Sequence, residues 1–243
     1  MIETKVDALQ TFFSCRELNA FYGESYVVQG VSFDIPEGDI VALLGRNGAG
    51  KTSTLRAIAR ASEPAVTSGE VWLNGQALHK MKAFEVACSG VQLVCKDRRI
   101  ISGVTVEENL ILAQIAEPIG WTSEKIYSHF PKSEERRKQE ASSLSGGEQQ
   151  MLALARALAR DVKLLLLNEP YEVLAPVIVQ EIERMLRKVK SMGITTIIVE
   201  QNAVAALKLA DQTIIIDSGE IVFTGTAQEV LDNQQLREEY LAV

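Results

Sequence analysis

A glycine-rich segment is the first part of this sequence whose residue types and spacing could do chemistry. The pattern GxxxxGK[ST] is matched by Gly45, Arg46, Asn47, Gly48, Ala49, Gly50, Lys51 and Thr52. Small residues let such a loop curl until its N–H groups face phosphate oxygens, and the following helix N-terminus adds positive potential. We expect Lys51 to reach the β- and γ-phosphates of a nucleotide and Thr52 to supply one oxygen to Mg²⁺. A plain glycine turn is the alternative.

A serine and two glycines, Ser145, Gly146 and Gly147, open a second segment of interest. Behind them, apolar residues recur at i, i+3, i+4 and i+7, which predicts one buried helix face formed by Met151, Leu154, Ala155 and Leu158. Local physics accounts for the segment as an N-capped helix start. Its exposed N–H groups suit a second anion site equally well, so both interpretations stay open.

An apolar run at 164–167 ends in Asn168, Glu169 and Pro170. In an open parallel sheet, functional groups collect beyond the carboxyl ends of the strands, next to a phosphate-binding loop. Glu169 is then placed to orient or deprotonate a water that attacks the γ-phosphate. Without the glycine-rich loop, a strand simply emerging into solvent would be the better interpretation.

The elements that must position these residues divide into three stretches. Strands are expected at 12–15, 26–35, 39–44 and 70–73, and a helix is expected to begin at Lys51. Residues 97–160 are more helical and more charged, which makes them a candidate inserted helical subdomain. Apolar strands at 163–167, 194–199 and 212–216 then alternate with helices at 177–190 and 203–209, before a hairpin to 221–223 and two short helices. This alternation predicts an α/β fold with a parallel sheet covered on both faces.

Composition excludes several classes of protein. The 243 residues carry 25 Lys and Arg against 32 Asp and Glu, a net charge of −7, which argues against a general nucleic-acid binder. No apolar run approaches the roughly 20 residues of a membrane-spanning helix. Cys15, Cys88 and Cys95 lack CxxC spacing and a histidine cluster, so neither a disulfide framework nor a zinc site is expected. A reducing cytosol fits this composition.

Taken together, the three segments resemble an ABC transporter ATP-binding subunit, from about residue 12 to 242. Three further stretches are similar to the subunits of branched-chain amino acid importers: 130–137, 174–176 and 199–202. The resemblance implies a P-loop NTPase with a RecA-like core, an N-terminal antiparallel β region and the helical subdomain at 97–160. The chain 1–243 would be a single ATP-binding domain, with a flexible N-terminus at 1–10.

The resemblance also implies roles for individual residues. Tyr22 would stack on adenine, the loop through Ser53 would hold ATP, and Thr52 with Asn168 would hold Mg²⁺. Catalysis would depend on Lys51, Glu169 and Gln201, the last in a switch position usually held by His. The γ-phosphate bound by a partner subunit would be contacted by Ser145, Gly146, Gly147 and Gln149. Without the resemblance, the sequence favours a simpler interpretation, in which Tyr22 is an aromatic residue packed on the core and Gln201 is a solvated loop residue.

Partners follow from the same resemblance. With one P-loop and one Ser-Gly-Gly segment, the chain needs a second ATP-binding subunit, identical or related, to complete a site. Integral membrane permease subunits would dock on residues 96–110 at the cytoplasmic face of the plasma membrane. A periplasmic or extracellular substrate-binding protein would act indirectly, and no nucleic acid is expected. The cargo is not set by this chain.

Three residues depart from the family pattern near the expected γ-phosphate. Asn168 stands where an aspartate is usual, Lys96 where the family has glutamine or, in this branch, glutamate, and Val173 where it has glycine. The first two make the local charge more positive, which favours phosphate binding and weakens placement of Mg²⁺ and water. A loop conformation with positive φ would be strained at Val173. We therefore predict ATP binding with slowed hydrolysis.

Two functions compete on this basis. The first is an energy-coupling subunit that hydrolyses ATP for amino acid import, and the second is a regulatory or structural subunit with little hydrolysis. A third class, an ABC ATPase of DNA repair or translation, normally has a tandem cassette or a long coiled-coil insertion, and neither is present in the sequence.

Overall fold

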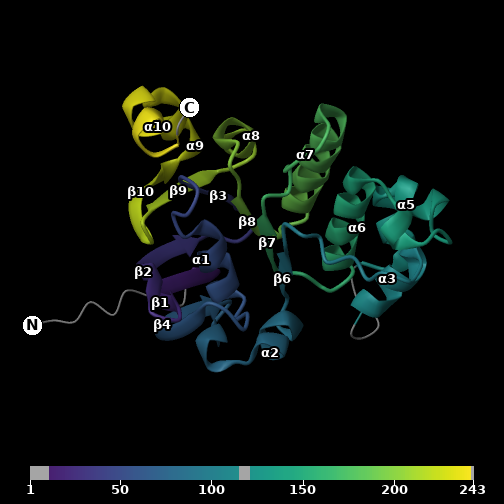
Figure 1. The fold of residues 1–243 in the computed structure, drawn as a ribbon, viewed down its shortest axis with the longest axis horizontal. Coiled ribbons are helices and arrows are strands. Elements are labelled where there is room, and N and C mark those ends of the chain that lie inside the picture. Colours follow the sequence, from purple (N-terminus) through teal and green to yellow (C-terminus); the bar gives the residue numbers. More distant parts are fainter. Residues whose placement is uncertain (1–10, 115–120, 242–243) are drawn as a thin grey trace, which may run out of the picture.

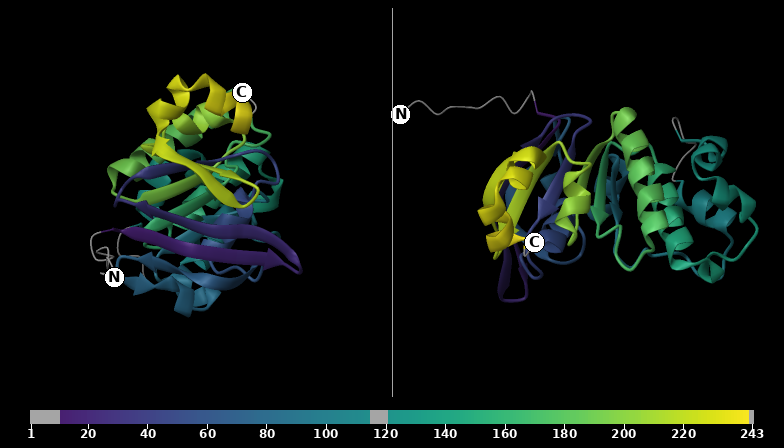
Figure 2. Two further views of the ribbon diagram at one scale, coloured as in Figure 1. Left: turned by 90° about the vertical axis from the view of Figure 1, so that its left-hand side faces the viewer. Right: turned by 90° about the horizontal axis from the view of Figure 1, so that it is seen from above.

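A computed structural model describes residues 11–114 and 121–241 of the chain (Figure 1). The expected flexible N-terminus at 1–10 lies outside the described residues. Two β-sheets stand at one end, and a group of helices forms the other end (Figures 1 and 2). The fold class expected from the sequence, an α/β fold with an antiparallel region and a mainly parallel sheet, is confirmed.

The antiparallel sheet has the strand order β2-β1-β4-β5. Its strands are β1 (Phe13–Tyr22), β2 (Ser25–Ile35), β4 (Ala65–Leu73) and β5 (Gln76–Ala77). Strands β1 and β4 are longer than the strands expected at 12–15 and 70–73, because a bulge interrupts the alternation of apolar and polar residues along β1. Glu17 has φ 45°, and the pairing register shifts after Cys15. Gly69 fits against this bulge, where a Cβ would lie 2.4 Å from the Glu17 carbonyl oxygen.

The second sheet has the strand order β10-β9-β3-β8-β7-β6. Its strands are β3 (Ile40–Leu44), β6 (Val91–Val94), β7 (Leu164–Asn168), β8 (Thr195–Val199), β9 (Gln212–Asp217) and β10 (Glu220–Thr226). All neighbours pair in parallel except β9 and β10, which form the expected hairpin. The edge strand β6 was not predicted, because four residues ending just before a charged segment carry too little periodicity.

Alternate residues of β7 enter two different cores. Leu164 and Leu166 pack with α1 (Lys51–Ile58) between the two sheets. Leu165 and Leu167 pack on the other face, with α6 (Gly146–Leu158) and α7 (Pro176–Ser191). Because successive side chains of a strand point to opposite faces, the sheet separates α1 from α6. The helix that follows the glycine-rich loop and the helix that follows the Ser-Gly-Gly segment therefore pack on different faces of the sheet.

The helical end of the molecule contains α3 (Val106–Ala113), α4 (Ser123–His129), α5 (Pro131–Glu135) and α6 (Figure 1). Outside this group, α2 (Ala83–Cys88) precedes β6. Thr105 and Glu108 form a reciprocal capping box at the start of α3. Near the C-terminus, α8 (Ala203–Leu207), α9 (Ala227–Asp232) and α10 (Gln234–Tyr240) cover the sheet around Leu44 and Ile215.

No helix in the described part of the chain, 11–114 and 121–241, has the length and apolar character required to span a bilayer.

Candidate nucleotide-binding site

Three parallel strands end at one place and deliver the candidate residues. β3 leads into Gly45, β7 ends at Asn168, and β8 is followed by Glu200. The register places Asn168 beside Val199 and Leu43 beside the same residue. Glu169 donates its backbone N–H to the Val199 carbonyl oxygen at 2.8 Å. The strand-end position expected for Glu169 is therefore present in the fold.

The glycines of the loop are required by its geometry. Gly45 has φ 147°, and a Cβ there would lie 2.1 Å from the Ile216 carbonyl oxygen. Gly50 has φ 105°, and its Cβ would lie 2.6 Å from the Val27 carbonyl oxygen. Gly50 is also the N-cap of α1 and supplies no side-chain cap, so the first N–H groups of the helix stay available to an anion.

Lys51 is the first residue of α1 and is 5% exposed. Its Nζ donates to the carbonyl oxygens of Gly45 at 2.8 Å and Arg46 at 2.9 Å, so the ammonium lies inside the curl of the loop. Burial lowers the pKa of Lys51, whereas the carboxylates of Glu169 and Glu200 favour its charged form. An ammonium held by neutral carbonyl oxygens can be recruited by phosphate oxygens, which carry the opposite charge.

Thr52 and Asn168 are adjacent, with the Thr52 hydroxyl donating to Asn168 Oδ1 at 2.9 Å. These are two neutral oxygen atoms, whereas protein Mg²⁺ sites usually include one or two carboxylates besides phosphates and water. Among the described residues, no group of three or more His, Cys, Asp or Glu could hold a metal. The pair therefore fits Mg²⁺ only as an ion whose remaining ligands come from the nucleotide and water.

Lys96 bridges two carboxylates at the mouth of this site. Its Nζ lies 2.9 Å from Oε2 of Glu169 and 2.7 Å from Oε1 of Glu172. Hydrogen bonds to Glu172 and Glu169 raise the pKa of Lys96, so it stays protonated at neutral pH. The sequence analysis expected Lys96 near the γ-phosphate. It did not indicate that the Lys96 ammonium would form an ion pair with Glu169, the carboxylate expected to orient or deprotonate the attacking water.

A cleft of about 460 Å³ opens beside Thr52, Asn168 and Lys96. Its cations outnumber its acids: Arg56, Lys96, Arg98 and Arg99 face it together with Asp97 and Glu172. This local excess of positive charge, in a chain of net charge −7, suits a polyanionic ligand. The Arg98 guanidinium also approaches the second motif, since a Cβ on Gly146 would lie 3.2 Å from Arg98 Nη1.

Glu200 is a buried acid behind the catalytic candidates, with 4% of its surface exposed. It accepts the backbone N–H of Tyr171 at 2.8 Å and that of Gln201 at 3.2 Å. Burial raises the pKa of Glu200 to about 7, the backbone hydrogen bonds oppose the shift, and the Glu169 carboxylate adds to it. Glu200 thereby links the loop after β7 to the loop after β8.

The Ser-Gly-Gly segment is an N-capped helix start. Ser145 is the N-cap of α6, and Glu148 donates its backbone N–H to Ser145 Oγ while its carboxylate returns to the Ser145 backbone. Gly147 is buried against α7, where a Cβ would lie 2.9 Å from Ile178 Cγ1. Ser145 and Gly146 remain exposed, and Gln149 points back to the Leu144 carbonyl oxygen. The segment can therefore still receive an anion from outside the chain.

The described structure does not bring every predicted residue to one place. Apolar residues of α1, the helix that begins at Lys51, pack in the core between the two sheets, and apolar residues of α6, which follows Ser145, pack in the core on the other face. Tyr22 is half-buried at the end of β1, paired with Ser25, and Ser53 lies in the first turn of α1. Gln201 is exposed directly after Glu200.

Val173 follows Glu172 in the loop after β7 and has φ 54°. The left-handed region is unfavourable for a β-branched residue, so the strain expected at this position is present. The side chain is also 92% exposed, which leaves an apolar group in solvent in the described chain.

Four functional candidates were not singled out from the sequence: Arg56, Arg98, Glu172 and Glu200. Arg98 and Arg99 form a basic pair that could have been noticed. Arg56, Glu172 and Glu200 carry no local signal, because only the fold brings them to the site.

Comparisons with known proteins agree with this geometry. The family model described as ABC transporter matches residues 28–172. The high-affinity branched-chain amino acid transport ATP-binding protein BraG of Pseudomonas aeruginosa is 37% identical over 93% of this chain and 97% of its own length. A probable branched-chain amino acid transport ATP-binding protein, LivF of Archaeoglobus fulgidus, is 34% identical over 90% and 94%. A nucleotide-free ATP-binding cassette has the same fold, with a TM-score of 0.82, 22% identity and coverage of 94% and 98%.

Proposed function

The chain belongs to the ABC transporter family of ATP-binding proteins, and from this premise we propose that it is the energy-coupling subunit of an importer for branched-chain or related amino acids. The observation that carries the proposal is the 37% identity to BraG across nearly both full lengths. We propose that 1–243 acts as one ATP-binding domain, with 97–160 as its helical subdomain.

In this proposal the loop from Gly45 to Ser53 binds the phosphates of ATP, and Tyr22 supports the adenine. Lys51 exchanges its contacts with the Gly45 and Arg46 carbonyl oxygens for β- and γ-phosphate oxygens, which are stronger, charge-assisted acceptors. Thr52 and Asn168 would hold Mg²⁺, which would neutralise phosphate charge. Glu169 orients the attacking water, and Gln201, which lines the same cleft as Glu169, is a second polar group.

A second ATP-binding subunit completes the site. Because residues of α1 and of α6 pack on opposite faces of the sheet, we propose that the α6 N-terminus of this chain serves the nucleotide of a partner subunit and not its own. Two copies, or this chain and a paralogue, would bring Ser145, Gly146, Gly147 and Gln149 of one subunit to the γ-phosphate on the other. ATP then holds the pair closed, and hydrolysis lets it reopen.

Docking to the membrane is proposed through residues 96–110, which connect the nucleotide cleft to α3. Integral permease subunits would bind this segment from the membrane side, so the chain acts as a peripheral protein on the cytoplasmic face. A substrate-binding protein outside the membrane would select the cargo. Lys96 and Arg98 belong to this segment and also line the nucleotide cleft, which would give a physical link between the two.

A second candidate function is an ATP-binding subunit with little hydrolysis, and one observation favours it. Lys96 occupies the Glu169 carboxylate at 2.9 Å, and an ion-paired carboxylate is a weaker acceptor for a proton from water. Both versions bind ATP. The two versions differ in whether Lys96 stays paired with Glu169 when the two ATP-binding subunits close. In the hydrolysing version, Lys96 would exchange Glu169 for a negatively charged phosphate oxygen.

The test is reconstitution of this chain with the permease and binding-protein subunits of a branched-chain amino acid importer. We expect ATP-dependent uptake of leucine, isoleucine or valine into vesicles. We also expect the loaded binding protein to stimulate phosphate release. Uptake that needs this chain while phosphate release stays at background would select the low-hydrolysis version. Failure of the folded chain to retain adenine nucleotide at about millimolar concentration would remove both versions, since ordinary nucleotide sites bind more tightly than this.

A further inference from the structure

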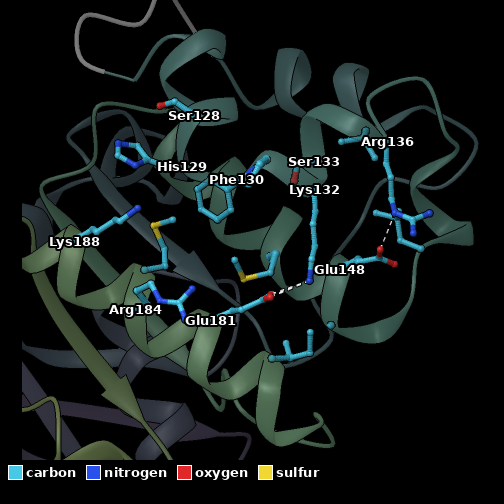
Figure 3. A pocket seen from close by; sticks show the side chains of 17 residues that line it. Ser128, His129, Phe130, Lys132, Ser133, Arg136, Glu148, Glu181, Arg184 and Lys188 are labelled. Carbon is cyan, nitrogen blue, oxygen red and sulfur yellow. Dashed lines mark hydrogen bonds and ion pairs between the residues drawn. The ribbon is translucent and has the colours of Figure 1, made fainter.

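A second cavity lies between α5, α6 and α7 (Figure 3). Its volume is about 230 Å³. Apolar side chains form its inner wall: Phe130, Leu144, Met151, Ile178 and Met185. A dry apolar cavity of roughly 150 Å³ is enough for benzene, so this cavity can hold a larger small molecule.

The rim of the cavity is cationic. Lys132, Arg136, Arg184 and Lys188 line it, against the two acids Glu148 and Glu181. Both acids are already paired, because Lys132 Nζ lies 2.9 Å from Glu181 and Arg136 Nε lies 2.7 Å from Glu148 (Figure 3). No ion pair is formed by Arg184 or Lys188 within the residues that the structure describes.

Two neighbouring observations strengthen this charge pattern. Arg184 and Lys188 are four residues apart on α7, a spacing at which like charges repel. His129 faces the same opening opposite Lys188 (Figure 3), and its pKa is lowered by burial and then by the charges of Lys188 and Lys125. An anion placed between these groups would relieve the repulsion.

We propose that this cavity binds a small amphipathic anion, with a carboxylate held by Arg184 and Lys188 and an apolar body of about ten non-hydrogen atoms packed on Met151 and Met185. The flexible thioethers of the two methionines can adapt to different apolar shapes. A whole partner helix, about 10 Å across with its side chains, is too wide for a space of about 230 Å³.

The position of the cavity gives the ligand a way to act on the nucleotide site, and this part of the inference rests on the proposed function. Leu144 and Gly147 line the cavity and flank the exposed Ser145 and Gly146. Gly147 is also packed directly against Ile178 of α7, since a Cβ on Gly147 would lie 2.9 Å from Ile178 Cγ1. A ligand between α5, α6 and α7 fixes the orientation of the segment that closes on the partner subunit's ATP.

The binding experiment uses the full chain and 4-phenylbutyrate as the probe, followed by calorimetry or ligand-observed NMR. We expect saturable binding, and binding at least about fivefold weaker for 4-phenylbutan-1-ol, which has the same body without the charge. The double variant Arg184→Gln with Lys188→Gln should weaken carboxylate binding about tenfold or more. Arg187→Gln, an exposed arginine of α7 outside the cavity, is the matched control.

Three results would overturn the site: no saturable binding to folded protein, equal affinity for acid and alcohol, or equal loss in the double variant and the Arg187 control. Met151→Trp, which fills the cavity, should abolish binding while circular dichroism stays native, and unchanged binding would count against it. If the probe binds but ATP-dependent pairing of the subunits does not change, the effect on closure is refuted while the site stands. The binding measurement needs no ATP, so its outcome is independent of the proposed transport function.

Discussion

The ammonium of Lys96 and the carboxylate of Glu169 form an ion pair at 2.9 Å across the mouth of the nucleotide cleft. Glu172 shares the same ammonium at 2.7 Å. The pair joins the segment after β6 to the segment after β7, the two neighbouring strands whose ends border the cleft. A group proposed to position water is thus held by a cation that also lies close enough to attract phosphate.

Lys96→Gln should raise the ATPase rate of the assembled complex by about tenfold, because it releases the Glu169 carboxylate and keeps a polar side chain at the position. Steady-state phosphate release measures the effect. Lys163→Gln removes an exposed lysine at the opposite end of β7 and should leave the rate unchanged. An unchanged rate in Lys96→Gln would show that the ion pair does not limit hydrolysis.

Asn168→Asp should make nucleotide binding more dependent on Mg²⁺, since it replaces a neutral oxygen by a carboxylate beside Thr52. ATP affinity should rise in Mg²⁺ and fall in EDTA, each by about threefold to tenfold. Fluorescent nucleotide titration in both buffers gives the ratio. Asn233→Asp at the N-cap of α10 makes the same charge change outside the Thr52–Asn168 pair, and an equal response there would refute the assignment.

Val173→Gly should stabilise the isolated chain by about 1 kcal/mol, because glycine accepts the φ of 54° that strains valine. Little burial is lost, since the valine is 92% exposed. Urea unfolding reports the free energy of unfolding. Val173→Asn serves as a second variant that tolerates the left-handed region, and stabilisation by neither would contradict the strain.

Glu200 should make stability fall as pH rises. Its folded pKa of about 7 lies above the ordinary value of 4.5, so the folded state holds more protons than the unfolded state between these values. The free energy of unfolding therefore decreases as pH rises through this range. Glu200→Gln should remove about 2–3 kcal/mol of this pH dependence between about pH 4.5 and 8. Thermal unfolding across that range tests it, and parallel curves for the two proteins would refute the buried-acid assignment.

Gly45→Ala should destabilise the chain much more than Gly48→Ala. Both positions have positive φ, which costs about 1–2 kcal/mol in alanine. Only at Gly45 does a Cβ meet backbone, 2.1 Å from the Ile216 carbonyl oxygen, whereas at Gly48 nothing lies within 4 Å. Chemical denaturation of both variants should separate them by at least about 2 kcal/mol, and equal losses would show that the loop shifts freely.

Local patterns in the sequence were sufficient for the parts of the fold that depend on neighbours along the chain. The buried strand before Asn168, the helix beginning at Lys51 and the helix that follows Ser145 were predicted from residue types and periodicity, and all are present. The bulge at Glu17 and the short edge strand β6 were missed, because neither produces a repeated pattern.

The sequence by itself determined that this chain has a nucleotide-type glycine loop, an α/β core and a family resemblance, because each depends on residue types at fixed spacing. Tertiary structure alone decided which groups meet. Lys96 and Glu169 are 73 residues apart, and Thr52 and Asn168 are 116 apart, yet each pair is in hydrogen-bond contact. The same sheet carries the apolar residues of α1 and of α6 on opposite faces. Sequence spacing carries no information on such contacts, since they follow from strand order and from the face to which each side chain points.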